Sequence, residues 1–244
     1  MIEILIPLAF SFFTTLIFLP LNIFLAKKYK LIDNPKVRPH PAHIQNRIVP
    51  RAGGLACFVG ILATVIFFIP MQKFILGILL AIFVLLIIGL WDDKKPNFSP
   101  YIRLLSQILA ASIVVASGIG ISFITNPFGG LINFDSIIIP FNFLGTHKII
   151  LFADLLALFW IVWVMNMINW SKGVDGQMPG IVLVTSLVLG ILSLGFFLQG
   201  DTSQLNVAKL AFITAGTAGA LLIFNWFPAK IFPGFSGSTI LGLM

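Results

Sequence analysis

Long apolar segments that recur at short intervals are the feature that most constrains how this sequence can fold. A helix needs about 20 apolar residues to cross a hydrocarbon core of about 30 Å, and segments of this length recur between short polar breaks. We therefore predict an all-α polytopic membrane protein, with one membrane domain over residues 1–244, seven complete transmembrane helices and the start of an eighth. The spans are expected at 4–26, 53–69, 74–91, 102–124, 149–168, 181–198 and 205–224, and the eighth begins at 238–244.

Charge is scarce and unevenly distributed. Only 9% of the residues are charged, against roughly 25% in soluble domains. Of the fifteen Lys and Arg residues, all but Lys73, Lys148 and Lys209 fall in or beside the breaks 27–52, 92–101, 169–180 and 225–237. Because cytoplasmic loops carry the excess of Lys and Arg, we predict that these four breaks are cytoplasmic and that the N-terminus lies outside. The net charge of +7 is then mainly topological and indicates no nucleic-acid partner.

Two adjacent carboxylates, Asp92 and Asp93, stand where the third apolar segment ends. Such a pair can bind a hard cation such as Mg²⁺ through oxygen, or one acid can take a proton from a nucleophile. The alternative is a solvated helix end in which the acids pair with Lys94 and Lys95. Arg103 follows on the next segment, where its guanidinium could meet a phosphate near the membrane surface.

The end of the fifth apolar segment gathers amides, glycines and an acid. Asn166 and Asn169 are three residues apart, so they share one face of the helix end. Two carboxamides there could orient a nucleotide or a ligating carboxylate. Asp175 follows among glycines that let the backbone approach a ligand closely. A helix end with a glycine-rich turn is the alternative.

The break before the second apolar segment ends in Arg51, Ala52, Gly53 and Gly54. The planar guanidinium of Arg51 suits a phosphate. The glycine pair opens the next helix and permits either tight packing or exposed backbone N–H groups. Charge that serves topology, combined with a small-residue helix contact, is the alternative.

The last break contains two prolines and two glycines, which indicate that no continuous helix runs through it. We expect residues 234–238 to cradle a phosphate with backbone N–H groups and with the hydroxyls of Ser236 and Ser238. A turn between helices is the alternative.

The opposite face of the bilayer is expected to carry little chemistry. Residues 125–148 include an alternating run, 134–139, which predicts one small hairpin near the interface. Asp154 lies in the fifth segment toward the outer side. An acid inside a membrane is a functional candidate, but its distance from the four polar breaks favours a structural role.

Taken together and in this order, the polar breaks resemble a known family of polytopic enzymes, the polyprenyl-phosphate N-acetylhexosamine-1-phosphate transferases. This family includes undecaprenyl-phosphate GlcNAc-1-phosphate transferases and phospho-MurNAc-pentapeptide translocases. The likeness runs from His43 to Gly242, and an arginine at position 51 resembles the pattern of the GlcNAc-1-phosphate branch. The similar elements are PRxGG at 50–54, the acidic pair at 92–93, NxxN at 166–169, DGxDG at 172–176 and PAKxFxGDxGS at 228–238.

The resemblance implies transfer of a sugar-1-phosphate, GlcNAc-1-phosphate above all, from a UDP-sugar to undecaprenyl or another polyprenyl phosphate. UMP is released, and the product initiates a cell-envelope glycan. Mg²⁺ or Mn²⁺ is the implied cofactor, and Asp92, Asp93 and Asp175 are the implied catalytic residues and metal ligands. The implied partners are the lipid phosphate and the UDP-sugar at the cytoplasmic side of a bacterial plasma membrane, and a homodimer is left open. The implied substrate-binding residues are His43, Arg51, Gly53, Gly54, Arg103, Asn166, Asn169, Lys172, Asn225, Lys230, Ser236 and Ser238.

Two positions depart from the family pattern. Lys172 stands in place of the first acid of DGxDG, and Phe235 in place of the acid of GDxGS, which is a Mg²⁺ ligand in the family. Either the remaining acids hold the metal with substrate oxygens, or Lys172 partly replaces the cation's charge, or the chain is inactive. A non-catalytic relative that binds polyprenyl phosphate or a nucleotide sugar is therefore the alternative function. A transporter is disfavoured, because its ionisable groups should lie at mid-membrane. The chain has fewer spans than the family usually has, so we expect a C-terminal truncation.

Overall fold

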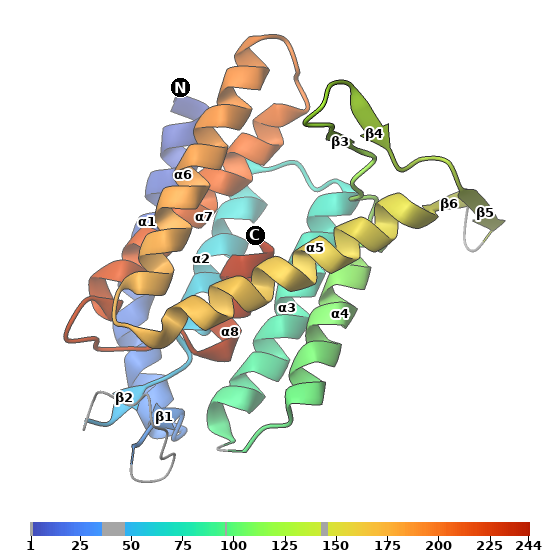
Figure 1. Ribbon diagram of the computed structural model, residues 1–244. Helices are drawn as coiled ribbons and strands as arrows, with labels where there is room; N and C mark the ends of the chain where they lie inside the picture. The colour runs from blue at the N-terminus through green and yellow to red at the C-terminus, as the bar shows by residue number, and fades with distance from the viewer. Residues whose placement is uncertain (1, 36–46, 96, 143–145) are drawn as a thin grey trace.

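The computed structural model describes residues 2–35, 47–95, 97–142 and 146–244. Within these residues the chain forms a helical bundle with three short strand pairs at its ends (Figure 1). The helices are α1 (Ile2–Lys28), α2 (Gly53–Phe68), α3 (Lys73–Lys94), α4 (Pro100–Ala116), α5 (Leu151–Trp170), α6 (Gln177–Leu198), α7 (Gln204–Asn225) and α8 (Gly234–Leu243), with a 3₁₀ turn, η1 (Ser171–Gly173), between α5 and α6.

All seven predicted spans coincide with helices, which confirms the all-α polytopic class. Helices α1, α3, α5, α6 and α7 are long and apolar enough to cross a membrane, while α2 and α4 are apolar but shorter. Helix α4 ends at Ala116, earlier than the expected 124, because the chain turns at Gly118, whose φ is 107°. The number of complete spans and the orientation of the N-terminus stay predictions.

Three antiparallel strand pairs connect the helices. Strand β1 (Ile32–Asp33) pairs with β2 (Val49–Pro50), with Ile32 opposite Pro50. Strand β3 (Phe123–Thr125) pairs with β4 (Leu131–Asn133), and β5 (Ile138–Asn142) pairs with β6 (Thr146–Ile150). The hairpin predicted within 125–148 is present as β5–β6, and a second pair, β3–β4, precedes it, because Gly129 and Gly130 adopt positive φ and turn the chain back early.

The helices alternate in direction, so their connections separate into two groups (Figure 1). The segments that follow α1, α3, α5 and α7 lie toward the lower part of the view, together with β1 and β2. The N-terminus, the α6–α7 connection and strands β3 to β6 lie toward the upper part. The four polar breaks predicted from the sequence therefore gather at one end of the bundle.

Helix α8 is short and lies inside the bundle, packed against α2, α3 and α5 (Figure 1). It begins at Gly234, so the expectation of a loop over 234–238 and of a helix from residue 238 was wrong; that these residues bind a phosphate stays a prediction. Pro233 stands just before the first helical residue, where its missing N–H is not needed, and Gly234 supplies a φ of 72°. These two residues start a helix rather than prevent one. All residues from 234 to 242 are buried.

Small residues allow α8 to lie this close to its neighbours. A Cβ built on Gly54 of α2 would overlap the backbone at Gly237, and one built on Gly89 of α3 would lie 2.5 Å from Ser236 Cα. Association of membrane helices depends on such close approach, because lipid gives no hydrophobic driving force between them. Of the two interpretations of the glycine pair, packing is the one observed: the N–H groups of Gly53 and Gly54 donate to the carbonyls of Phe232 (3.0 Å) and Pro233 (3.2 Å).

Asp154 has the structural role that its position predicts. It lies in the first turn of α5, and its Oδ2 accepts the N–H of Ile150 at 2.9 Å. The carboxylate thus satisfies one of the amide groups that a helix start leaves without an intrahelical partner.

Candidate active site

Arg51 is held at the polar end of the bundle by two backbone contacts. Its N–H donates to the carbonyl of Leu31 (2.8 Å), and Pro50 accepts the N–H of Phe232 (2.8 Å). These bonds tie the segment before α2 to the segment before α8. The guanidinium then lies 3.3 Å from Asp33 Oδ1 and 3.5 Å from Asp93 Oδ1, with 16% of the side chain exposed. Arg51 therefore sits between two buried acids.

The Asp93 carboxylate caps the N-terminus of α8. Its Oδ1 accepts the N–H of Phe235 (2.8 Å), and its Oδ2 accepts the hydroxyl of Ser236 (2.8 Å) and, at 3.4 Å, the Ser236 N–H. A carboxylate at a helix N-terminus is favoured by the unpaired N–H groups and the helix dipole. A Cβ on Gly234 would overlap this carboxylate, so only glycine fits there. We call Arg51, Asp93, Gly234 and Ser236 the Asp93 clamp.

Asp92 points to the other side of the same helix end. Its Oδ1 lies 2.6 Å from Nε of Arg103, and 1% of the Asp92 side chain is exposed against 38% for Arg103. The ion pair joins α3 to α4 at the polar end of the bundle. Because Arg103 uses Nε for Asp92, its two Nη groups can donate to a ligand.

Two cations lie against one aromatic ring beside this ion pair. The Phe235 ring has Arg103 Cζ 5.8 Å and Lys172 Nζ 5.9 Å from its centroid, and Phe235 is 2% exposed. We call Arg103, Lys172 and the Phe235 ring the Phe235 face. Burial, together with the nearby charges of Arg51 and Arg103, lowers the pKa of Lys172 to about 8, while the carboxylates of Asp93 and Asp92 act in the opposite direction. The clamp and the face are thus two sides of one charged cluster.

Asn166 and Asn169 of α5 hold the residues and helices around this cluster in place through hydrogen bonds. Asn169 Oδ1 accepts both the Lys172 ammonium (2.6 Å) and the Ser238 hydroxyl (2.8 Å), which fixes Lys172 against α8. Asn166 donates to Gln107 of α4 at 2.9 Å. The two carboxamides therefore serve to hold α4, α5 and α8 together.

Asp175 belongs to a neighbouring cluster. Its Oδ2 accepts the Arg47 guanidinium (2.9 Å) and the Ala229 N–H (2.8 Å). Asn225 accepts the Gly176 N–H (3.0 Å) and donates to the Ile231 carbonyl (2.9 Å), so the turns after α5 and α7 are joined. This cluster positions the segment that carries Lys172.

A family model described as "Glycosyl transferase family 4" matches residues 75–244. The match covers well over half of the chain and includes Asp92, Asp93, Arg103, Asn166, Asn169 and all of α8. The chain belongs to glycosyl transferase family 4.

Curated relatives of this family 4 chain have related names. It is 27% identical to a "Probable undecaprenyl-phosphate N-acetylglucosaminyl 1-phosphate transferase" of Bacillus subtilis, over 99% of the chain and 61% of that protein. It is 31% identical to a "Decaprenyl-phosphate N-acetylglucosaminephosphotransferase" of Mycobacterium leprae, over 90% of the chain and 54% of that protein. A "Phospho-N-acetylmuramoyl-pentapeptide-transferase" of Limosilactobacillus reuteri is 28% identical over 95% and 69%. The chain thus spans between half and two thirds of the length of the first two.

Most of the residues that the sequence singled out come together in this family 4 chain. Arg51, Asp92, Asp93, Arg103 and Lys172 form the charged cluster. Asn169, Ser236 and Ser238 pack beneath it, and both serine hydroxyls are buried and hydrogen-bonded within the protein.

Three expected residues lie elsewhere. Asp175 and Asn225 form the neighbouring cluster, and Lys230 is exposed, with its Nζ 5.8 Å from the Phe224 ring. His43 lies outside the described residues. Asp33, which pairs with Arg51, was not predicted as a site residue; an acid directly after the first span, in a mostly basic segment, was the available signal.

The expected Mg²⁺ or Mn²⁺ can be tested against the acids that would hold it. Asp92, Asp93 and Asp175 are each bound to a guanidinium or to backbone N–H groups, and Asp175 belongs to a different cluster from the other two. Over the described ranges, no three His, Cys, Asp or Glu side chains converge as metal ligands would. These residues do not fit a metal site built from three carboxylates.

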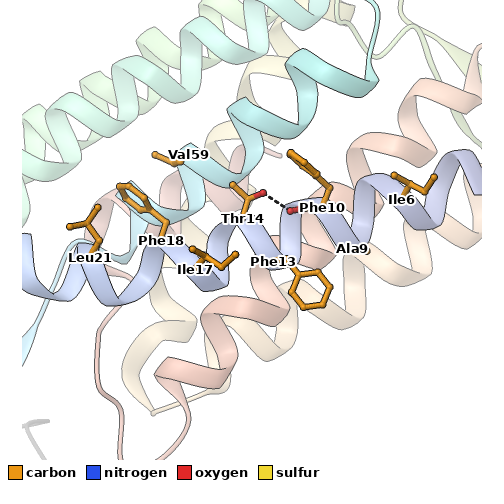
Figure 2. A pocket seen from close by; sticks show the side chains of 9 residues that line it. All are labelled: Ile6, Ala9, Phe10, Phe13, Thr14, Ile17, Phe18, Leu21 and Val59. Carbon is orange, nitrogen blue, oxygen red and sulfur yellow. Dashed lines mark hydrogen bonds between the residues drawn. The ribbon is translucent and has the colours of Figure 1, made fainter.

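A separate groove runs along α1 from Ile6 to Leu21 and is closed on one side by Val59 of α2 (Figure 2). Its volume is about 670 Å³. The polar side chain that lines it is Thr14, whose hydroxyl donates to the Phe10 carbonyl at 2.6 Å. The groove suits hydrocarbon and offers nothing to a phosphate.

Proposed function

We propose that this chain transfers a sugar-1-phosphate from a UDP-sugar, GlcNAc-1-phosphate by preference, to a polyprenyl phosphate in the bilayer. The observation that carries the proposal is the charged cluster at the buried start of α8, where Arg51, Arg103 and Lys172 from three separate segments meet. The relatives' names, which specify undecaprenyl or decaprenyl phosphate and N-acetylglucosamine, support the same reaction.

In the proposed reaction an oxygen of the lipid phosphate attacks the sugar-linked phosphorus of the UDP-sugar. A P–O bond forms there, the P–O bond to the uridine-linked phosphate breaks, and UMP leaves with that bridging oxygen. The product is a polyprenyl pyrophosphate sugar. Such a reaction depends on alignment and on neutralising negative charge more than on covalent help from the protein.

The three cations supply the neutralisation. Arg103 has two Nη groups to donate, and Lys172 has ammonium hydrogens beyond the one that bonds Asn169. Asp92 holds Arg103 in place and is the acid of the pair that can receive a proton from a protonated lipid phosphate, because Asp93 is bonded to α8. Asn166 and Asn169 hold the supporting helices.

The alternative is a relative that binds the lipid phosphate or the nucleotide sugar without turnover, and the internal pairing of all three expected catalytic acids favours it. Purified chain in lipid nanodiscs, given undecaprenyl phosphate, would be assayed for UMP release from UDP-GlcNAc and from UDP-MurNAc-pentapeptide, with and without Mg²⁺ or Mn²⁺. We expect UMP from UDP-GlcNAc, lost by at least about 100-fold in Asp92→Asn.

Asp201→Asn is the matched control, because Asp201 is exposed at the opposite end of the bundle and should leave turnover unchanged. Lipid binding with no UMP release from either donor would contradict the transferase proposal and support the non-catalytic binding protein.

We also propose that the cluster faces the cytoplasm of a bacterial cell. The distribution of Lys and Arg over the connections supports this orientation. Cys57 is the sole cysteine and is buried, so introduced cysteines can be labelled selectively. In intact cells, an impermeant maleimide should label Asp201→Cys and should label Lys95→Cys only after permeabilisation; the reverse pattern would invert the topology.

A further inference from the structure

The cations of the charged cluster are not neutralised equally. Arg51 has two acids near it, Asp33 and Asp93, and Arg103 has Asp92. Lys172 has Asn169 Oδ1, a neutral acceptor, at 2.6 Å, and it forms no ion pair with any residue that the structure describes. Its ammonium is half-buried and keeps donors for another partner.

Arg103 and Lys172 approach the same side chain, and that side chain carries no charge. The Phe235 ring attracts both cations through its quadrupole, but such contacts contribute only about 0.5–2 kcal/mol each. Two cations in one partly buried site repel each other unless an anion lies between them. A phenyl ring also cannot ligate a metal ion. Phe235 therefore presents apolar surface where an acid at this position would present a carboxylate.

Resting on the proposed function, we propose that Arg103 and Lys172 bind a substrate phosphate directly, without a divalent cation. The phosphate oxygens accept hydrogen bonds from the Nη groups of Arg103 and from the ammonium of Lys172, over the Phe235 ring. The positive charges of Arg103 and Lys172 take the part that a metal ion would have in neutralising the phosphate. This agrees with the poor fit of the three acids to a metal site.

Two ligands carry the required phosphate, the polyprenyl phosphate and the UDP-sugar. Binding of each would be measured separately to the purified chain in nanodiscs, in excess EDTA and in excess Mg²⁺. We expect at least one of them to bind in EDTA with a Kd within about threefold of its value in Mg²⁺. The ligand that does so identifies which phosphate lies over Phe235.

Substitutions at Lys172 locate the site. Lys172→Gln should weaken that binding about tenfold or more in EDTA, because a charge-assisted hydrogen bond is lost. Lys172→Arg should keep most of the affinity. Lys94→Gln, an exposed lysine at the end of α3, is the control and should change affinity less than twofold.

The proposal is overturned if EDTA abolishes binding of both ligands, or if Lys172→Gln binds as well as Lys94→Gln while the chain remains folded. Failure of the proposed function has a different signature. Phosphate binding that persists in EDTA and depends on Lys172, with no UMP released, would leave this site in place and remove the transferase.

Discussion

The Asp93 clamp and the Phe235 face adjoin each other at the start of α8, yet they differ in how their charges are satisfied. In the clamp, Asp93 forms an ion pair with Arg51, accepts hydrogen bonds from the Ser236 hydroxyl and from backbone N–H groups, and is fully buried. On the face, Lys172 and Arg103 meet a neutral ring. A satisfied buried network stabilises the fold, whereas a cation without an ion pair, as Lys172 is among the described residues, marks a binding site. Stability should therefore depend on the clamp and ligand binding on the face.

The largest effect is expected from Gly234→Ala. The new Cβ would overlap the Asp93 carboxylate, and alanine would have to adopt a φ of 72°. We expect a loss of about 3 kcal/mol in the free energy of unfolding, measured by thermal unfolding in detergent. Gly173→Ala is the control, since a Cβ there meets nothing within 4 Å. Equal unfolding midpoints for the two variants would show that the clamp is not tight.

Asp93→Asn should come next. The carboxamide has nearly the same shape but lacks the charge opposite Arg51, and it turns one donor toward the N–H groups of α8. We expect a loss of about 2 kcal/mol in the free energy of unfolding, measured by the same thermal unfolding in detergent. Asp201→Asn, at an exposed site, should leave the unfolding midpoint nearly unchanged, because the carboxamide oxygen can still accept the hydrogen bonds from Ser203. A stability of Asp93→Asn close to this control would contradict the structural role of Asp93.

Ala52 tests the backbone that carries Arg51 into the clamp. It has φ 99° and ψ 24°, a left-handed conformation that L residues avoid and that glycine, which has no Cβ, adopts readily. Ala52→Gly should therefore raise the free energy of unfolding by about 0.5–1 kcal/mol. The matched change Ala56→Gly, within α2, should lower it by about 1 kcal/mol. The same sign in both variants would show that Ala52 is not strained.

The smallest effect on stability is expected on the face. Lys172→Gln removes a half-buried cation that forms no ion pair among the described residues, while the carboxamide can still donate to Asn169. We expect the free energy of unfolding to stay within about 0.5 kcal/mol of the unchanged chain or to rise. A loss comparable to that of Asp93→Asn would make Lys172 part of the fold and erase the contrast.

Much of the fold follows from local pattern. Segments of about 20 apolar residues predict helices because lipid leaves a backbone no other hydrogen-bonding partner. Local pattern failed at residues 234–238, where Pro233 and Gly234 indicate a break when read alone. They begin a helix because Asp93, more than 140 positions earlier, supplies the acceptor for its first N–H groups.

The site was predictable as a set of residues but not as a set of contacts. Residue type and order identified Arg51, Asp92, Asp93 and Arg103, since charged groups are rare in such a chain. Which partner each acid has depends on tertiary geometry, so the sequence could not separate Asp93, which binds the start of α8, from Asp92, which pairs with Arg103. Asp33 was missed for the same reason, because its partner Arg51 is brought to it by the β1–β2 pair.

The most direct test is UMP release from UDP-GlcNAc in excess EDTA, with undecaprenyl phosphate as the acceptor. It asks whether Arg103 and Lys172 of the Phe235 face support transfer without a divalent cation. The unchanged chain should continue to release UMP when divalent cations are removed, and Lys172→Gln should be slower by about tenfold or more. Complete loss of UMP release in EDTA, together with unchanged turnover by Lys172→Gln in Mg²⁺, would contradict it.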